Sequence, residues 1–474
     1  MNVLLISTYE LGRQPFGLAS PVAWLREAGA TVTCLDLSRE SFNEEFVRAA
    51  DVVAFYVPMH TATRLAAQLI EPVRKLNPRA HICFYGLYAP MNEGYLRKLG
   101  AQSILGGEFE EGLLHLVERL RRGGPMCPPD SGATICPPIE EAHAGAPLQA
   151  EPPISLARQT FLVPDRSGLP PLAQYAHLVV PGGAHRVVGY TEASRGCKHL
   201  CRHCPIVPVY NGAFRVVQRE IVLADIRRQV AAGAQHITFG DPDFFNGPAH
   251  ALAIVEALHS EFPQLTYDVT IKVEHLLHHA GKLPALRDTG CLFVTSAVEF
   301  VDDAVLAKLD KNHTRADFLA VVKLCREAGL ALQPTFVPFS PWTTLATYAE
   351  LLRVLAENDL VESVAPIQLA IRLLIPAGSR LLELDDVRQM VAPFDEAALV
   401  FPWRHADPRV DALCQEIEQI VRSGEMHKQS REKIFARIWD AASSAAGLPA
   451  RWQVPEPVLV ARAAIPYLNE PWYC

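Results

Sequence analysis

The sequence has no excess of positive charge and no long apolar run, and each lack removes a class of function. Across 474 residues the formal net charge is −8, so the basic surface that a nucleic-acid backbone demands is missing. No stretch approaches the roughly 18 consecutive apolar residues of a membrane span. We therefore expect neither nucleic acid nor membrane as a partner, and a small molecule is the better candidate for the substrate.

Closely spaced cysteines are also scarce. Of the 11 cysteines, all but three stand singly, as small buried residues usually do, although Cys127 and Cys136 in a proline-rich segment could form a weak metal or redox pair. No signal peptide is evident, so we expect a cytoplasmic location in which thiols stay reduced. A hydrophobic content of 49% with 20% charged residues is typical of a globular protein, and the length allows two or three domains.

The remaining cysteines, Cys197, Cys201 and Cys204, follow a C-x3-C-x2-C spacing. Three thiolates can ligate one iron–sulfur cluster and leave the fourth iron without a protein ligand. An open iron can chelate a small molecule and deliver an electron into it, much as catalytic zinc keeps an open position. The alternative is a structural zinc knuckle, with His199 or His203 as the fourth ligand.

A strand predicted at 190–194 leads into this loop, and strands alternate with helices from Val187 to about Asp385. With the cysteine spacing, this pattern resembles the radical S-adenosylmethionine (radical SAM) superfamily, and a zinc knuckle would not predict it. The resemblance implies a 4Fe–4S cluster on the three cysteines and S-adenosylmethionine (SAM) at the open iron. It also implies reductive cleavage of SAM to a 5′-deoxyadenosyl radical, with reduced flavodoxin or ferredoxin as the electron donor.

The first 122 residues alternate short apolar runs with amphipathic stretches, which predicts a doubly wound, flavodoxin-like parallel sheet. The predicted strands are Asn2–Ser7, Thr31–Leu37, Val52–Val57, His81–Tyr85 and Ser103–Leu105. The predicted helices are Ala19–Glu27, Glu44–Ala49, Thr61–Leu76, Glu93–Lys98 and Glu110–Arg121.

Placed before a radical SAM motif, this domain is similar to the cobalamin-binding domain of the cobalamin-dependent branch, so cobalamin is a candidate cofactor. The loop Thr8–Gly17 lacks the histidine by which such domains replace the lower cobalt ligand. Either cobalamin binds without a protein ligand to cobalt, or the domain has kept its fold and lost the cofactor.

The family resemblance also assigns SAM contacts. After the strand predicted at Gln235–Phe239, Gly240 allows close approach and Asp241 or Asp243 could accept from the SAM ammonium group; a solvated Asp-Pro turn is the plain alternative. Lys272 could pair with the SAM carboxylate or be simply solvated. Glu299, at the end of a strand near Leu292–Val298, could accept from both ribose hydroxyls.

Two further strands, Leu330–Val337 and Ile367–Leu374, would close the partial barrel, with Arg372 either facing its interior or paired as a structural charge. The resulting fold class is α/β, with a flavodoxin-like domain, a partial (β/α)6 radical SAM barrel and a helical C-terminal extension. The predicted domains are 1–122, a proline-rich linker at 123–182 with a docking segment near Pro164–Leu172, the radical SAM core at 183–385, and the extension at 386–474.

The chain ends on Cys474. This ending and the loop motifs look most like a group of radical SAM proteins whose tails read Cys-Cys-Ala-Glu-Pro or Cys-selenocysteine-Ala-Glu-Pro. The hypothesis is that a selenocysteine codon follows Cys474; the alternative is an ordinary terminus with a free thiol.

The predicted function is radical SAM modification of a small molecule, with methyl transfer if cobalamin binds. Without cobalamin, hydrogen abstraction or transfer of the aminocarboxypropyl group of SAM is the alternative. A cluster-containing sensor or a corrinoid carrier is the non-enzymatic alternative.

Overall fold

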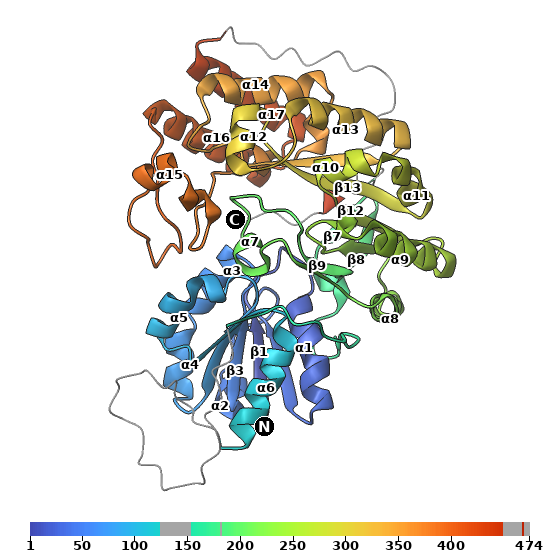
Figure 1. The fold of residues 1–474 in the computed structure, drawn as a ribbon, viewed down its shortest axis with the longest axis vertical. Coiled ribbons are helices and arrows are strands. Elements are labelled where there is room, and N and C mark those ends of the chain that lie inside the picture. The colour runs from blue at the N-terminus through green and yellow to red at the C-terminus, as the bar shows by residue number, and fades with distance from the viewer. Residues whose placement is uncertain (124–152, 181–182, 449–466, 469–474) are drawn as a thin grey trace. The chain divides into compact units, whose positions relative to one another are not determined.

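The computed structural model describes residues 1–123, 153–180, 183–448 and 467–468. The predictions for Cys127, Cys136 and the Cys474 tail fall outside these residues. The chain divides into two compact units (Figure 1): unit 1 comprises Met1–Glu10 and Pro15–Pro170, and unit 2 comprises Leu11–Gln14 and Pro171–Cys474. The division into four functional parts stays a prediction.

Unit 1 contains a parallel sheet with the strand order β2-β1-β3-β4-β5-β6. Its strands are β1 (Asn2–Ser7), β2 (Thr31–Asp36), β3 (Val52–Tyr56), β4 (His81–Tyr85), β5 (Ser103–Gly107) and β6 (Ile154–Ser155). Strands β3 and β4 are buried at every residue, as expected for a parallel sheet covered on both faces. The order changes direction between β1 and β3, the point at which sheets of this kind bind ligands.

Helices cover both faces of this sheet. They are α1 (Phe16–Glu27), α2 (Glu44–Ala49), α3 (His60–Ala67), α4 (Ile70–Leu76), α5 (Glu93–Leu99) and α6 (Phe109–Arg121). The apolar residues of α1 and α6 form one core with one face of the sheet, and those of α2 to α5 form a second core with the other face. The doubly wound fold predicted from the sequence is therefore confirmed.

One predicted helix is divided in two. The pattern predicted a continuous helix at Thr61–Leu76, whereas α3 ends at Ala67 and α4 begins at Ile70. Pro72 explains the break, because a proline inside a continuous helix would remove a backbone hydrogen bond and clash with the preceding turn. The break places Pro72 in the first turn of α4, where proline is tolerated.

The proline-rich segment contributes to unit 1 as well. Asp165, inside the predicted docking segment, donates its backbone N–H to the carbonyl of Ala19 at 2.9 Å. Its carboxylate lies 2.6 Å from the guanidinium of Arg26. Both contacts attach the segment to α1.

Unit 2 contains a curled sheet with the strand order β14-β13-β12-β11-β8-β7-β15. Its parallel strands are β8 (His185–Thr191), β11 (His236–Phe239), β12 (Thr266–Thr270), β13 (Cys291–Glu299) and β14 (Ala331–Phe336). Two short antiparallel strands, β7 (His177–Val179) and β15 (Tyr467–Leu468), extend one edge. Because the long strands are parallel, the loops that follow them meet at one carboxyl edge, which is where the site is built.

The strand predicted at Ile367–Leu374 is wrong. A short 3-10 helix, Pro366–Leu369, occupies its first half, because Pro366 favours the start of a helical turn. Beyond it, Arg372 forms a single isolated bridge to Phe339. The Arg372 guanidinium lies 2.6 Å from Asp411 and 3.6 Å from the ring centre of Trp403, so it is a paired structural charge.

Helices surround this sheet and form the C-terminal part of unit 2. They are α7 (Val207–Tyr210), α8 (Arg219–Ala231), α9 (Pro248–Glu261), α10 (Val273–His278), α11 (Leu283–Asp288), α12 (Asp303–Leu309), α13 (Arg315–Ala328), α14 (Leu345–Glu357), α15 (Asp385–Met390), α16 (Pro408–Met426) and α17 (Arg431–Ala446). Helix α17 packs against α14 and α16. Among the helices described, none has both the length and the apolar character of a bilayer span.

Candidate functional site

The three cysteines lie on a loop held at its base by a two-stranded ribbon, β9 (Ser194–Gly196) and β10 (Phe214–Val216). Gly196 precedes Cys197 with φ of 74°, and an added Cβ would lie 2.4 Å from the Tyr210 ring, so this position requires glycine. The side-chain amide of Asn246 bonds the carbonyl of Gly196 and the N–H of Lys198, both at 3.2 Å. The backbone on both sides of Cys197 is therefore fixed.

Two distant elements fasten the rest of the loop. The backbone N–H of Arg202 donates to the carbonyl of Leu309 at 2.9 Å, and its guanidinium donates to two more carbonyls at the C-terminal end of α12. From the other side, Arg380 donates to the carbonyl of Leu200 at 2.9 Å and Ser379 donates to the carbonyl of Arg202 at 3.3 Å. The loop is thus positioned before any iron binds.

Replacing Arg380 with methionine should make a reconstituted cluster easier to lose. The Leu200 carbonyl would lose a charged donor, which costs about 1 kcal/mol and corresponds to roughly a fivefold faster loss of the cluster. The half-life of the cluster absorbance in air would measure this effect. Arg388→Met is the matched control, because Arg388 bonds only residues close to it in the chain, namely the carbonyls at 382 and 383 and the carboxylate of Asp385. Equal half-lives in the two variants would contradict the assignment.

The cysteine side chains suit a cluster of iron atoms. Burial raises the pKa of Cys197 to about 11 and that of Cys204 to about 12, and Cys201 is also buried. Thiols with the raised pKa values of Cys197 and Cys204 ionise readily only when a bound metal stabilises the thiolate. The donor set, three thiolates on one preorganised loop, fits a 4Fe–4S cluster that keeps one iron free of protein ligands.

Gly240 and Asp241 follow β11 and contact the segment that leads into the cysteine loop. An added Cβ at Gly240 would lie 1.8 Å from the hydroxyl of Tyr190, so glycine is required here. The Asp241 carboxylate accepts from the Ser194 hydroxyl at 2.5 Å and from the Ala193 N–H at 2.9 Å. Both carboxylate oxygens are thus engaged with the segment that precedes the cysteines.

Asp241 should give the protein a measurable pH dependence. Burial raises the pKa of Asp241 to about 7, against hydrogen bonds from Ser194 and Ala193 that lower it. Between about pH 4 and pH 7 the folded chain therefore keeps a proton that the unfolded chain loses, and stability falls as the pH rises through this window. Asp241→Asn, which is neutral at every pH, should remove roughly 2–4 kcal/mol of this pH dependence.

Urea unfolding of both chains at pH 5 and pH 8 would measure the effect as the difference between their pH slopes. Charges common to both chains, such as those of Asp243 and Glu299, cancel in that difference. Equal slopes for the two chains would contradict the account.

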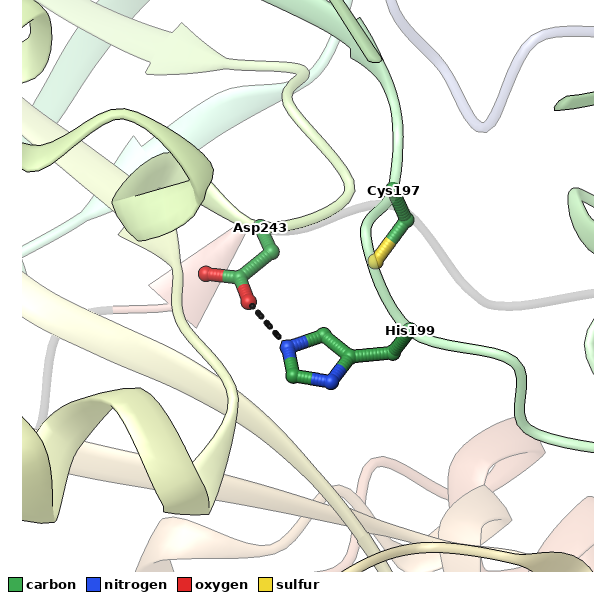
Figure 2. A group of neighbouring side chains, drawn as sticks. All are labelled: Cys197, His199 and Asp243. Atoms are coloured by element: carbon green, nitrogen blue, oxygen red, sulfur yellow. Dashed lines mark ion pairs between the residues drawn. The ribbon is translucent and has the colours of Figure 1, made fainter. Parts of the chain in front are cut away.

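Asp243 follows in the same loop, and its side chain contacts the cysteine loop. Its side chain is 1% exposed, and one carboxylate oxygen lies 2.7 Å from His275 Nδ1 and 3.4 Å from His199 Nε2. Burial would raise the pKa of Asp243, but the neighbouring His199 and His275 lower it below its usual value. Figure 2 shows the sulfur of Cys197 facing the same space as the Asp243 carboxylate and the His199 ring.

Lys272 and Glu299 complete the predicted SAM contacts, and the structure places them at the same carboxyl edge. Lys272, just beyond β12, is 7% exposed. Its Nζ makes no hydrogen bond, and it lies 3.7 Å from a carboxylate oxygen of Glu274. A buried ammonium group of this kind can still take a carboxylate partner.

Glu299 ends β13 at a register shift and has φ of 69°, an unusual value for a residue with a side chain. Its Oε1 lies 3.0 Å from His203 Nε2 and 3.2 Å from Lys311 Nζ. Burial would raise the pKa of Glu299, but the neighbouring Lys311 and His203 hold it well below its usual range. Both of these polar contacts involve Oε1, which leaves Oε2 available to a ligand.

Whether unit 1 fits cobalamin can be judged from the residues at its switch point, the edge where the loops after β1 and β3 lie. The loop after β1 contains no histidine, and its Thr8 hydroxyl is bonded to the carbonyl of Ala62 in α3. A histidine is nevertheless present at this edge. His60 is the first residue of α3 and ends the loop that follows β3. The switch-point edge thus carries an imidazole, which fits a corrinoid, although this histidine is on the second loop rather than the first.

The sequence analysis did not identify several of these contributors. No role was predicted for Asn246, Ser379 or Arg380, and neither His203 nor Lys311 was linked to Glu299. The spacing of the cysteines gives no signal for any of them. The bonds of Asn246, Ser379 and Arg380 to the cysteine loop span 48 to 180 residues. Glu299 meets His203 across 96 residues and Lys311 across 12.

Comparisons with known proteins agree with this site. Residues 191–352 match the family model of the radical SAM superfamily, so the chain contains a radical SAM domain. The chain is 25% identical over 178 residues to ribosomal protein uS12 methylthiotransferase RimO of Syntrophotalea carbinolica, which covers 36% of this chain and 39% of that protein. It is 24% identical over 351 residues to hopanoid C-3 methylase of Methylococcus capsulatus, covering 72% and 64%. The chain thus spans less than two thirds of either relative.

Solved structures extend the likeness beyond that domain. The cobalamin-dependent S-adenosylmethionine radical enzyme OxsB, with aqua-cobalamin and SAM bound, aligns with a TM-score of 0.70 at 13% identity, covering 94% of this chain and 71% of that chain. The radical SAM methyltransferase TsrM from Kitasatospora setae, with tryptophan and a SAM analogue bound, aligns with a TM-score of 0.61 at 18% identity, covering 83% and 77%. At these identities the likeness shows the fold, and it confirms the predicted fold class.

Proposed function

We propose that this chain is a radical SAM enzyme that reductively cleaves SAM to modify a small molecule, with cobalamin-dependent methyl transfer as the favoured reaction. The observation that carries the proposal is that Cys197, Cys201 and Cys204 lie on a preorganised loop, inside a domain that matches the superfamily. These three cysteines would hold a 4Fe–4S cluster, which would supply the electron for reductive cleavage of SAM to methionine and a 5′-deoxyadenosyl radical.

The residues around the loop provide the binding and positioning that this chemistry needs. Lys272, buried and without a hydrogen bond, would pair with the SAM carboxylate. Asp243, with Gly240 and Asp241 in the same loop, would take the ammonium group; of the two acids Asp243 is favoured, since both oxygens of Asp241 are already engaged. Glu299, fixed through Oε1, would accept from the ribose hydroxyls through Oε2.

The proposal of methyl transfer depends on cobalamin binding to unit 1. When bound there, cobalamin would supply a carrier for the methyl group, and the loops after β1 and β3 would hold it, with His60 as the nearby imidazole. Of the two structural relatives named above, OxsB is a cobalamin-dependent SAM radical enzyme and TsrM is a radical SAM methyltransferase, which supports the proposal. Cobalamin-independent chemistry, such as aminocarboxypropyl transfer, is the second candidate, because the loop after β1 lacks a histidine.

The proposal also covers the electron donor, the location of the enzyme and its subgroup within the family. A reduced flavodoxin or ferredoxin would be the electron donor, and the enzyme would work in the cytoplasm. The chain would belong to the group with a Cys-Cys-Ala-Glu-Pro or Cys-selenocysteine-Ala-Glu-Pro tail. Reading the gene in frame past the codon of Cys474 tests the last point, which fails if no Ala-Glu-Pro follows.

The function is tested by anaerobic reconstitution with iron and sulfide, followed by incubation with SAM and dithionite. We expect 5′-deoxyadenosine, measured by mass spectrometry, and none when dithionite is left out. Intact SAM in a chain that carries about four irons would favour a sensor or carrier over an enzyme. A parallel incubation with cobalamin and removal of the free cofactor should leave about one cobalamin per chain; if none is retained, the methyl-transfer part of the proposal fails and cobalamin-independent chemistry is favoured.

A further inference from the structure

A second set of metal ligands overlaps the cluster loop. The sulfur of Cys197, a ring nitrogen of His199 and a carboxylate oxygen of Asp243 all lie within 4.8 Å of one another (Figure 2). This group includes neither Cys201 nor Cys204. A single ion placed at Cys197 would therefore be shared with His199 and Asp243, not with the other two cysteines.

The surroundings of these three residues are those of a metal site. One oxygen of Asp243 accepts from the backbone N–H of Phe245 at 3.1 Å, and the other lies 2.7 Å from His275 Nδ1. His199 has one ring nitrogen toward Asp243, and its other ring nitrogen lies 3.5 Å from a carboxylate oxygen of Glu274. A carboxylate behind the second nitrogen of a histidine is the usual outer partner of a metal-bound imidazole.

The ligand atoms also have unmet bonding capacity. Asp243 is 1% exposed and the His199 side chain is 10% exposed, so neither is well solvated. Asp243 Oδ2 and His199 Nε2 are buried and make no well-formed hydrogen bond. Buried polar atoms in this state are costly unless a partner satisfies them, and a cation between the three donors would do so.

We propose that the cluster-free chain binds one zinc-class divalent cation through Cys197, His199 and Asp243, with water in the fourth position. Thiolate, imidazole and carboxylate are the ligands that zinc prefers, and three protein ligands leave zinc one open position. Binding releases the Cys197 thiol proton to solvent as the sulfur–metal bond forms. Because Cys197 would also ligate the cluster under the proposed function, zinc and the cluster exclude each other, and zinc occupancy blocks cluster assembly.

Cobalt titration of a chain that cannot build the cluster tests the site. In the double variant Cys201→Ser, Cys204→Ser, Co²⁺ should bind at about one per chain and give the absorption of a single thiolate–cobalt bond in a near-tetrahedral site. Adding His199→Gln should weaken Co²⁺ binding by at least roughly tenfold, which is a loss of about 1.4 kcal/mol. Asp243→Asn, a second and sterically conservative variant, should weaken it in the same way.

His203→Gln is the matched control, because it changes the other histidine of the same loop. We expect Co²⁺ affinity in the double variant to be unaffected by it. Equal weakening by His199→Gln and His203→Gln would overturn the proposal, and so would Co²⁺ binding without a thiolate band. Circular dichroism of each variant would show that the fold is retained.

Competition in the wild-type chain tests the exclusion. Protein loaded with one equivalent of Zn²⁺ should assemble the cluster several times more slowly than zinc-free protein, and a chelator should restore the rate. Equal rates would overturn the exclusion. If no cluster forms even without zinc, the proposed function fails while the cobalt result still decides the zinc site, so the two failures are distinguishable.

Discussion

Replacing Cys201 with serine is expected to abolish 5′-deoxyadenosine formation, by at least roughly a thousandfold, which corresponds to about 4 kcal/mol. Cys201 is buried in the middle of the loop, where Arg202 and Leu200 are tied to two different elements. These bonds hold the loop, so we do not expect another thiol to take the place of Cys201. A serine hydroxyl is a far poorer iron ligand than a thiolate, so the cluster loses one of three protein ligands.

Iron content, cluster absorbance and 5′-deoxyadenosine should all fall together in this variant. The matched control is Cys414→Ala, which removes a buried cysteine from α16, far along the chain from the loop. We expect the control to keep both the cluster and SAM cleavage. A Cys201→Ser chain that retains full iron and full cleavage would contradict the ligand assignment.

The fold could be predicted where burial alone decides the local structure. Strands β1 and β4 match the predicted ranges, because each is a short apolar run with breaks on both sides. The prediction failed where one proline changes the outcome: Pro72 divides a predicted helix, and Pro366 turns half of a predicted strand into a helical turn. At Pro72 the periodicity continued through a position that a continuous helix could not accommodate, whereas Pro366 lies just before the predicted strand and starts the helical turn that replaces its first half.

The site was predictable only in part, for a different reason. The cysteine spacing is a local signal, and parallel strands bring Asp243, Lys272 and Glu299 to one edge, so the sequence could place them together. The partners of these residues have no such signal. Lys311 meets Glu299 because α12 is short enough to return the chain to the end of β13, and Arg380 reaches Leu200 across 180 residues. Such contacts depend on tertiary packing, which local pattern does not encode.

Replacing Glu299 with alanine is the second change with a large expected effect, and it should lower the free energy of unfolding by about 3–5 kcal/mol. Lys311 is 3% exposed, and its Nζ lies 3.2 Å from Glu299 Oε1. Burial would lower the pKa of Lys311, but the Glu299 carboxylate raises it, so the glutamate favours the charged form of the lysine. Without Glu299 the lysine must either stay charged and unpaired or give up its proton, and both are costly in a buried position.

The double variant Glu299→Gln, Lys311→Met separates the charge pair from the loss of a side chain. It removes both charges while filling similar volume, so unfolding in urea should show a clearly smaller loss of stability than Glu299→Ala alone. SAM affinity should fall in both variants, since each lacks the carboxylate proposed for the ribose. If the double variant is as unstable as Glu299→Ala, packing and not charge pairing determines the stability at this position. If SAM affinity is unchanged in both, Glu299 holds His203 and Lys311 in place but does not bind the nucleoside.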